Sequence, residues 1–227
     1  MSIADNIASI QQRISAAEKK SGRVPGSVKL IAVSKTKPLA MVQEAFVAGH
    51  IDFGENRDRE MRDKHKELAE VNWHMIGNFQ RSNIKYFISF VYLIHSISSE
   101  KLLRAVNKEA EKHQRVVDCL LQLHISGESA KSGLEPSEAE DLLRAIESFP
   151  NIRIKGLMGM AALSHDEKLI QSQFRSLRLA KEAFQAIQHP RIQLEELSMG
   201  MSGDYHLAIQ EGATMIRIGS AIFGSRG

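Results

Sequence analysis

The chain has a single cysteine, and it also lacks the features of several protein classes. Cys119 alone cannot form an intrachain disulfide or a thiolate metal cluster, which fits a reducing compartment. Its neighbours in VVDCLLQLHI are apolar, so we predict a small core residue there. No stretch approaches the ~20 apolar residues that a membrane span needs. The N-terminus lacks the basic-then-apolar pattern of a signal peptide. These absences predict a soluble cytoplasmic protein.

Blocks of like charge and linker-type segments are absent as well. The net charge is only +3, from 30 Lys and Arg against 27 Asp and Glu, and the two signs are interspersed. Nucleic acid is therefore not an expected partner. No Pro/Gly/Ser-rich or low-complexity tract divides the 227 residues. We predict one domain over residues 1–227, long enough to bury a substantial core.

The sequence instead alternates short apolar runs with helical patterns. The N-terminal segment places Ile3, Ile7, Ile10 and Ile14 at helical spacing, which predicts an amphipathic helix. Eight strand candidates follow, nearly all separated by a helical pattern: residues 29–34, 50–54, 73–77, 90–96, 116–126, 152–160, 192–200 and 213–220. Eight β/α units in about 200 residues suit a compact (β/α)8 barrel. A doubly wound open sheet is the alternative.

In either fold a ligand site lies at the C-terminal ends of the strands. Glycines and hydroxyls gather most densely after the last two, in SMGMSGD (198–204) and RIGS (217–220). Backbone N–H groups, hydroxyls and a helix starting near Asp204, capped by Ser202 or Asp204, would bind an anion. Gly219 would permit close approach and Ser220 would add a hydroxyl. These loops predict a phosphate site, with ordinary turn and cap residues as the alternative interpretation.

Two cationic side chains indicate the chemistry of the site. Arg217 interrupts an apolar strand on the face opposite Ile216 and Ile218, where it can bind phosphate, a carboxylate or a heteroaromatic nitrogen. Lys35 follows the apolar run LIAVS, and desolvation with cationic neighbours such as Lys37 would make its amine a nucleophile towards an aldehyde. An aldehyde and a phosphate on one molecule suggest pyridoxal phosphate (PLP). A Schiff-base aldolase acting on a phosphorylated sugar would use the same features, and ordinary charges at strand ends are the other alternative.

Eight motifs follow one another in an order that resembles the YggS/PROSC family of PLP homeostasis proteins. They are LIAVSKTKP, FGENR, WHMIG, IHS, ISGESAKSG, GLMGM, SMGMSGDYHLAI and EGATMIRIGSAIFG. The resemblance implies a (β/α)8 barrel similar to the N-terminal domain of bacterial alanine racemase, with PLP held as a Schiff base on Lys35. It further implies that the phosphate contacts map onto Ser202, Gly219 and Ser220. Arg217 would lie near the pyridine nitrogen or the phosphate. The residues that line the pocket would be Asn56, His74 and Met199.

The chain departs from the family pattern at several positions. After WHMIG the usual LQ-x-NK is replaced by a segment that contains Ser82 and Asn83, and FGENR is followed by Asp58-Arg59-Glu60. Ile97 follows IHS, and His124 precedes the Ile-Ser of ISGES. None of these positions coincides with the lysine or the phosphate loops. We expect them to affect surface contacts or partner choice more than cofactor binding.

The resemblance implies a non-catalytic carrier or buffer of PLP that maintains vitamin B6 and amino-acid/keto-acid balance and serves PLP-dependent apo-enzymes. The alternative is a PLP-dependent amino-acid racemase, which needs an acid/base on each face of the cofactor. Lys35 supplies one, and His74 or Tyr205 would have to supply the other. Related racemases use a second domain, whereas only seven residues follow Ser220 here, so we expect no robust catalysis.

Two expectations concern the surface of the protein. The charged segment 55–70 raises a third hypothesis, a regulatory interaction module that uses this segment as its contact face, although charge runs are generally solvated surface. No large apolar helix face is left over, so a monomer is expected.

Overall fold

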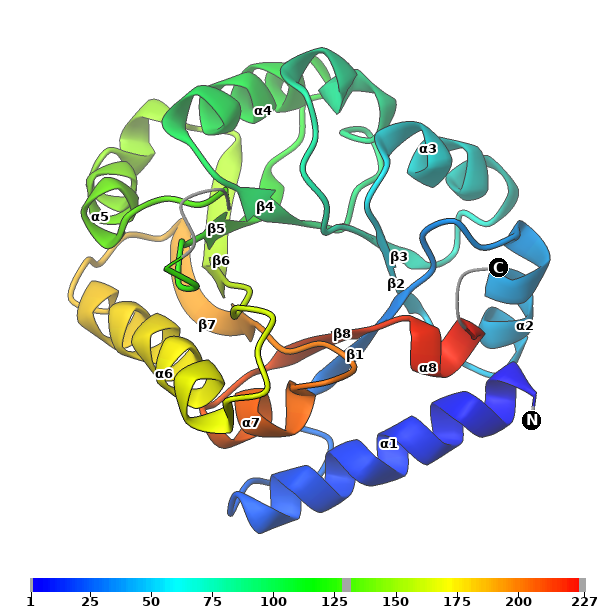
Figure 1. Cartoon of the computed structure of the whole chain (residues 1–227). Helices are drawn as coiled ribbons and strands as arrows, with labels where there is room; N and C mark the ends of the chain where they lie inside the picture. The colour runs from blue at the N-terminus through cyan, green and yellow to red at the C-terminus, as the bar shows by residue number, and fades with distance from the viewer. Residues whose placement is uncertain (1, 128–131, 225–227) are drawn as a thin grey trace.

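The computed structural model describes residues 2–127 and 132–224 as a closed barrel of eight parallel strands (Figure 1). Each strand pairs with the next, and β8 pairs back to β1. The strands are β1 Lys29–Val33, β2 Asp52–Glu55, β3 Asn72–Met75, β4 Leu93–Ile97, β5 Val117–Gln122, β6 Ile152–Met158, β7 Ile192–Ser198 and β8 Met215–Ile218. The predicted barrel is confirmed, and the open sheet is excluded because a closed barrel has no edge strands.

Helices surround the strands and connect most of them, as the alternating pattern predicts (Figure 1). The helices are α1 Ile3–Lys20, α2 Leu39–Val47, α3 Asp58–Glu67, α4 Glu100–Lys112, α5 Pro136–Arg144, α6 Glu167–Phe184, α7 Tyr205–Gln210 and α8 Ser220–Phe223, with 3-10 helices η1 Arg81–Tyr86 and η2 Ile146–Ser148. The connection from β3 to β4 holds only η1. The prediction of a strand over 116–126 is too long, since β5 ends at Gln122.

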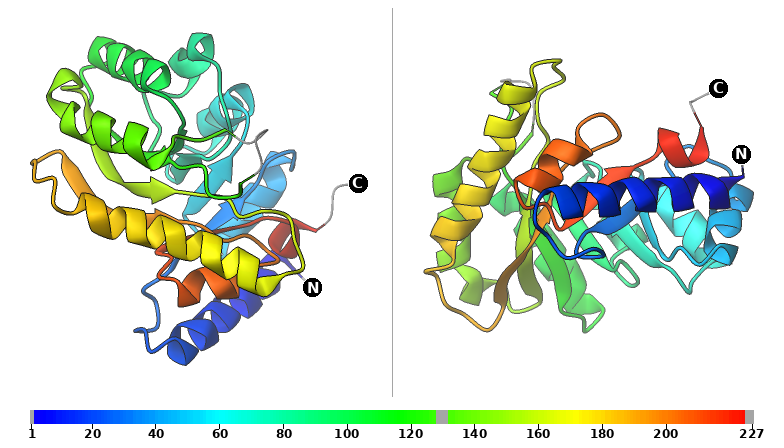
Figure 2. Two further views of the ribbon diagram at one scale, coloured as in Figure 1. Left: turned by 60° about the vertical axis from the view of Figure 1, so that its left-hand side comes forward. Right: turned by 90° about the horizontal axis from the view of Figure 1, so that it is seen from below.

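Helix α1 lies outside the ring of helices and contacts α2, α7 and α8 (Figure 2). Its isoleucine stripe is buried, as predicted. Near its end the buried carboxylate of Glu18 accepts hydrogen bonds from the backbone N–H groups of Gly26 and Val28 at 2.9 and 2.7 Å. This carboxylate satisfies the polar backbone of the loop that leads into β1, so the start of the barrel is held to the N-terminal helix.

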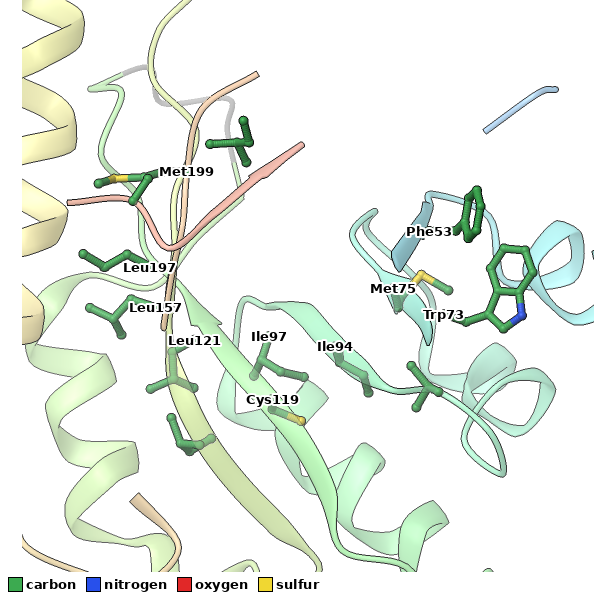
Figure 3. Close-up of a cluster of buried hydrophobic side chains, with 14 of the residues drawn as sticks. Phe53, Trp73, Met75, Ile94, Ile97, Cys119, Leu121, Leu157, Leu197 and Met199 are labelled. Atoms are coloured by element: carbon green, nitrogen blue, oxygen red, sulfur yellow. The ribbon is translucent and has the colours of Figure 1, made fainter. Parts of the chain in front are cut away.

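Side-chain alternation along the strands produces two apolar layers. The larger layer packs the outward side chains of the strands against the helices, and it includes Phe53, Trp73, Cys119 and Met199 (Figure 3). Cys119 is fully buried as predicted, and burial raises the pKa of its thiol. The smaller layer contains inward side chains of the strands: Ile31, Leu93, Leu120, Met158 and Met215. Because side chains fill the barrel centre, a ligand has room only at an end.

Two further observations limit the classes of site. Within residues 2–127 and 132–224, no helix is long and apolar enough to cross a membrane. The same part of the chain contains no group of three or more His, Cys, Asp or Glu side chains arranged to hold a metal ion.

Candidate functional site

A cavity of about 240 Å³ lies at the C-terminal end of the barrel. Its walls come from the end of β1, from the segments that follow β1, β2, β3, β6 and β7, from β8, and from the segment that follows β8: Val33, Lys35, Lys37, Asn56, Ile76, Met160, Met201, Ser202, Arg217, Gly219, Ser220 and Gly224. Several cations and hydroxyls therefore face a space with apolar walls, which is typical of a small-molecule site.

Six of the eight residues predicted for the site line this cavity: Lys35, Asn56, Ser202, Arg217, Gly219 and Ser220. They come from four different strand ends, separated by as many as 185 residues along the chain, counted from Lys35 to Ser220. The barrel closure between β1 and β8 brings the first and last of them together.

The prediction that Met199 and His74 line the pocket is wrong. Ser198, the last residue of β7, points inward and accepts a hydrogen bond from Arg217, so Met199 points outward into the layer between barrel and helices (Figure 3). The neighbouring Met201 lines the cavity instead. His74 does lie inside the barrel, but it is fully buried and hydrogen-bonded to Asp52 and His95. It belongs to a polar chain below the cavity.

The first predicted anion loop follows β7 and depends on Gly200. This residue has φ +92°, and an added Cβ would lie 2.6 Å from the Cβ of Ala208, so glycine is required by both conformation and space. The carboxylate of Asp204 accepts a hydrogen bond from the backbone N–H of Met201 at 2.6 Å and closes the loop. Helix α7 begins at Tyr205, directly after Asp204, as predicted, but no side chain of the described residues makes the expected capping hydrogen bond to the start of the helix. Ser202 is exposed in this loop and faces the cavity.

The second predicted anion loop is the turn from β8 into α8. A Cβ added at Gly219 would lie 3.0 Å from the carbonyl oxygen of Val33, so the end of β8 packs tightly against the end of β1. Ser220 then starts α8 at the mouth of the cavity. This close approach places the Gly219–Ser220 turn next to the segment that carries Lys35.

Arg217 occupies an inward position on β8 and is 5% exposed. Its Nη1 donates to Oγ of Ser198 at 2.7 Å and its Nη2 to the carbonyl oxygen of Gly159 at 3.3 Å. Burial lowers the pKa of the guanidinium to about 10, partly countered by the charge of Asp204, so the side chain stays a cation at neutral pH. Arg217 thus points inward, as strand alternation predicts, and it lines the cavity.

Lys35 and Lys37 lie on a tight turn after β1, and both side chains are half-buried. Thr36 between them adopts φ 62°, and its backbone N–H donates to Oε1 of Glu60 at 2.7 Å. Lys64 on α3 donates to the carbonyl oxygen of Ser34 at 2.8 Å. The turn is thus fixed by side chains of α3. If Lys35 does not form the Schiff base, Lys37 and Lys131 are the next candidates from the sequence, and Lys131 lies outside the described residues.

The departures from the family pattern lie away from the cavity. Asp58, Ser82, Asn83, Ile97 and His124 are not among the residues that line it. Two of them contact each other, because Nδ2 of Asn83 donates to Oδ2 of Asp58 at 3.0 Å and so joins η1 to the start of α3.

Several residues of the site were missed from the sequence. Val33, Ile76, Met160 and Met201 give the cavity its apolar walls. Val33 and Ile76 follow from strand alternation, since they occupy inward positions at the ends of β1 and β3. Met160 and Met201 lie in loops, where alternation no longer applies, so no sequence signal marks them.

Comparison with known proteins shows the same fold and a group of close relatives. Residues 3–227 match the family model described as "Alanine racemase, N-terminal domain". A pyridoxal phosphate homeostasis protein of Pseudomonas aeruginosa is 38% identical over 226 residues, which cover 99% of this chain and 96% of the relative.

Two solved structures extend this comparison. A protein of Bifidobacterium adolescentis described as unknown superposes with a TM-score of 0.93 at 35% identity and covers 97% of this chain and 94% of its own. The structure of PipY from Synechococcus elongatus with PLP bound gives a TM-score of 0.85 at 34% identity, covering 98% and 100%.

Proposed function

Because this chain belongs to the family of the pyridoxal phosphate homeostasis proteins, we propose that it binds PLP and acts as a carrier or buffer of that cofactor. One observation carries the proposal. The amine of Lys35, the cation Arg217 and two loops bearing Ser202, Gly219 and Ser220 converge on a single small cavity. An aldehyde and a phosphate on one molecule would each find a matching partner there.

The lining residues fit the parts of PLP. The hydroxyls of Ser202 and Ser220, with the backbone N–H groups of their loops, would hold the phosphate. Lys35 would hold the aldehyde as a Schiff base, with its nitrogen bonding to the aldehyde carbon and the aldehyde oxygen leaving as water. Ile76 and Met160 provide apolar walls for a ring, and Asn56 offers an amide to a polar ring substituent. Bound PLP supplies a reversible aldehyde and an electron-withdrawing ring.

Arg217 favours storage over catalysis. A guanidinium has donors and no acceptor, so a ring nitrogen that faces it accepts a hydrogen bond and stays unprotonated. An unprotonated ring withdraws electrons less strongly, which disfavours carbanion chemistry. Neither candidate for the second acid/base of a racemase supports that activity, since neither His74 nor Tyr205 lines the cavity. Lys37 does line it, and a racemase assay therefore belongs among the tests.

The wider role is part of the same proposal. We place the protein in the cytoplasm as a monomer that supplies PLP to PLP-dependent apo-enzymes and so maintains vitamin B6 and amino-acid/keto-acid balance. The free, buried Cys119 is consistent with a reducing compartment.

Borohydride trapping tests the covalent link. Purified protein mixed with PLP should show an imine absorption band, and reduction followed by peptide mass spectrometry should find the added mass on Lys35. Lys35→Ala should lose that band, whereas Lys37→Ala, on the same turn, should keep it. A full covalent signal in Lys35→Ala would refute the assignment.

Two activity assays separate carrier from enzyme. PLP transfer from the loaded protein to an apo-enzyme should be faster than release into buffer. A parallel assay should show no amino-acid racemisation at the rate of a dedicated racemase. Racemisation at such a rate would overturn the carrier proposal.

A further inference from the structure

A chain of four buried hydrogen bonds runs through the barrel beneath the cavity. Nη1 of Arg217 donates to Oγ of Ser198 at 2.7 Å, and Oγ lies 2.8 Å from Nδ1 of His95. Nε2 of His95 lies 2.9 Å from Nδ1 of His74, whose Nε2 lies 3.1 Å from Oδ1 of Asp52. We call this set, from Arg217 to Asp52, the interior chain.

The interior chain connects the two ends of the barrel. Arg217 lines the cavity at the C-terminal end. Asp52 is the first residue of β2, pairs with Asn72 at the start of β3, and lines a separate cavity of about 420 Å³ at the N-terminal end. The link between them is shielded from bulk solvent, because His74, His95 and Ser198 are each 0% exposed.

The two ends determine the direction of every hydrogen bond. A guanidinium can only donate, and an ionised carboxylate can only accept. His74 must therefore donate from Nε2 to Asp52 and accept at Nδ1, so His95 donates from Nε2. The hydroxyl of Ser198 then donates to Nδ1 of His95 and accepts from Arg217. Each of the four hydrogen bonds then has one donated hydrogen, and each hydrogen comes from a different group of the interior chain, provided that both imidazoles are neutral.

The surroundings favour these neutral forms. Burial lowers the pKa of His74, with Lys29 acting in the same direction and Asp52 and Glu196 against it. Burial also places the pKa of His95 well below its ordinary value, with further lowering from the neighbouring His74 and from the cations Arg217 and Lys29. An added proton on Nδ1 of His74 would make two donors face each other, since Nε2 of His95 already donates there. An added proton on Nδ1 of His95 would leave the hydroxyl hydrogen of Ser198 without its acceptor.

We propose that His74, His95 and Ser198 are positioning residues that hold Arg217 towards the cofactor, and that the carboxylate of Asp52 fixes the direction of the chain from the opposite end of the barrel. This role deepens, and rests on, the proposed PLP function. All the hydrogen bonds on which this positioning role depends join two groups of the protein. A change at Asp52 should reach the cavity through the interior chain, although Asp52 does not line that cavity.

Nitrogen NMR of the unsubstituted, PLP-free protein tests the direction of the chain. Long-range proton–nitrogen spectra should show both His74 and His95 protonated at Nε2 only, and still neutral at pH about 6.5, the ordinary pKa of histidine. A proton on Nδ1 of His95, or a doubly protonated ring on either residue, would overturn the proposal. This measurement needs no cofactor, so its result is independent of the proposed function.

Asp52→Asn tests the positioning role. The amide can donate as well as accept, so the direction is no longer fixed, and we expect PLP affinity to fall about three- to tenfold, as for one lost hydrogen bond. The absorption band of the bound cofactor should also shift. The matched control is Asp118→Asn, which removes a partly buried strand carboxylate paired with Arg153 at 2.6 Å, away from the interior chain.

The outcomes of this comparison are distinct. Equal PLP affinity and equal spectra in Asp52→Asn and Asp118→Asn would overturn the positioning role while PLP binding stands. Absence of any PLP binding by the unsubstituted protein would overturn the proposed function, and the NMR result would still decide the direction of the chain. If Asp52→Asn does not fold, Ser198→Thr against Ser198→Ala replaces it: the variant that keeps the hydroxyl should retain the spectrum, and loss of the spectrum in both would count against the role.

Discussion

Lys64 donates a hydrogen bond from Nζ to Oε1 of Glu55 at 2.7 Å, with both side chains buried behind the turn that carries Lys35. The same carboxylate oxygen accepts the hydroxyl of Ser34 at 2.6 Å. Burial raises the pKa of Glu55, and the charge and hydrogen bond of Lys64 act against that rise. Lys64 therefore favours the ionised form of Glu55 beneath the proposed cofactor lysine, and the pair joins α3 to the ends of β1 and β2.

Lys64→Met should destabilise the protein by about 3–5 kcal/mol, because it leaves the charge of Glu55 buried without its partner. The control is Lys66→Met on the same helix. Lys66 is 64% exposed and lies 3.8 Å from an exposed Asp63, so its loss should cost less than about 1 kcal/mol. Urea unfolding followed by the fluorescence of Trp73 measures both. Equal effects of the two substitutions would show that the Glu55–Lys64 pair contributes no special stability.

The pairing of Glu55 with Lys64 could not be predicted from the sequence. Segment 55–70 is rich in charge, and a solvated surface or a contact face was the expectation. In the structure Met61 and Lys64 are buried and turn one side of α3 towards the barrel. Glu55 takes an outward position on β2, so its partner depends on how α3 packs over that strand. Alternation predicts the direction of Glu55, but only packing selects Lys64.

The site was predictable to the extent that strand alternation and glycine loops determine it. Arg217 is inward because β8 alternates, and Gly219 and Ser220 follow where the strand ends. Met199 was misplaced because a motif, and not its strand position, assigned it to the pocket. The contacts of His74 with Asp52 and His95 join three different strands, and no local pattern in the sequence encodes that meeting.

Ser202→Ala and Ser220→Ala should each weaken PLP binding by roughly tenfold or more, since a hydrogen bond to a charged group contributes about 1.5–3 kcal/mol. Neither change should affect binding of pyridoxal, which lacks the phosphate. Fluorescence titration with both ligands separates the two effects. Ser172→Ala, on the exposed side of α6, is the control for the loss of a hydroxyl. An equal loss of affinity for pyridoxal would place these serines elsewhere than at the phosphate.

Gly200→Ala should cost about 1–3 kcal/mol, because φ +92° is strained for alanine and the new Cβ would meet Ala208 at 2.6 Å. The strain should also distort the loop that carries Ser202 and weaken PLP binding. Gly203→Ala in the same loop is the matched control, since an added Cβ there meets nothing within 4 Å. Thermal unfolding and PLP titration of both variants check this. A similar loss in both would indicate general loop sensitivity instead of a requirement at Gly200.

Acidification should destabilise the protein through its buried histidines. The pKa of His74 and of His95 is lowered from the ordinary 6.5, chiefly by burial, so near pH 6.5 the unfolded chain binds protons that the folded chain does not. Their contribution is therefore complete above pH 6.5 and is lost as pH falls from there towards the folded pKa. Each histidine adds a slope of up to about 1.4 kcal/mol per pH unit.

Urea unfolding across this pH range should show the loss directly. His95→Gln should be less stable at neutral pH but should show a shallower pH dependence, by up to one proton, because one buried imidazole no longer contributes. His113→Gln, at the exposed end of α4, controls for the removal of an imidazole as such. An unchanged slope in His95→Gln would mean that His95 takes up its proton as readily in the folded as in the unfolded chain, in conflict with its burial between His74 and Ser198.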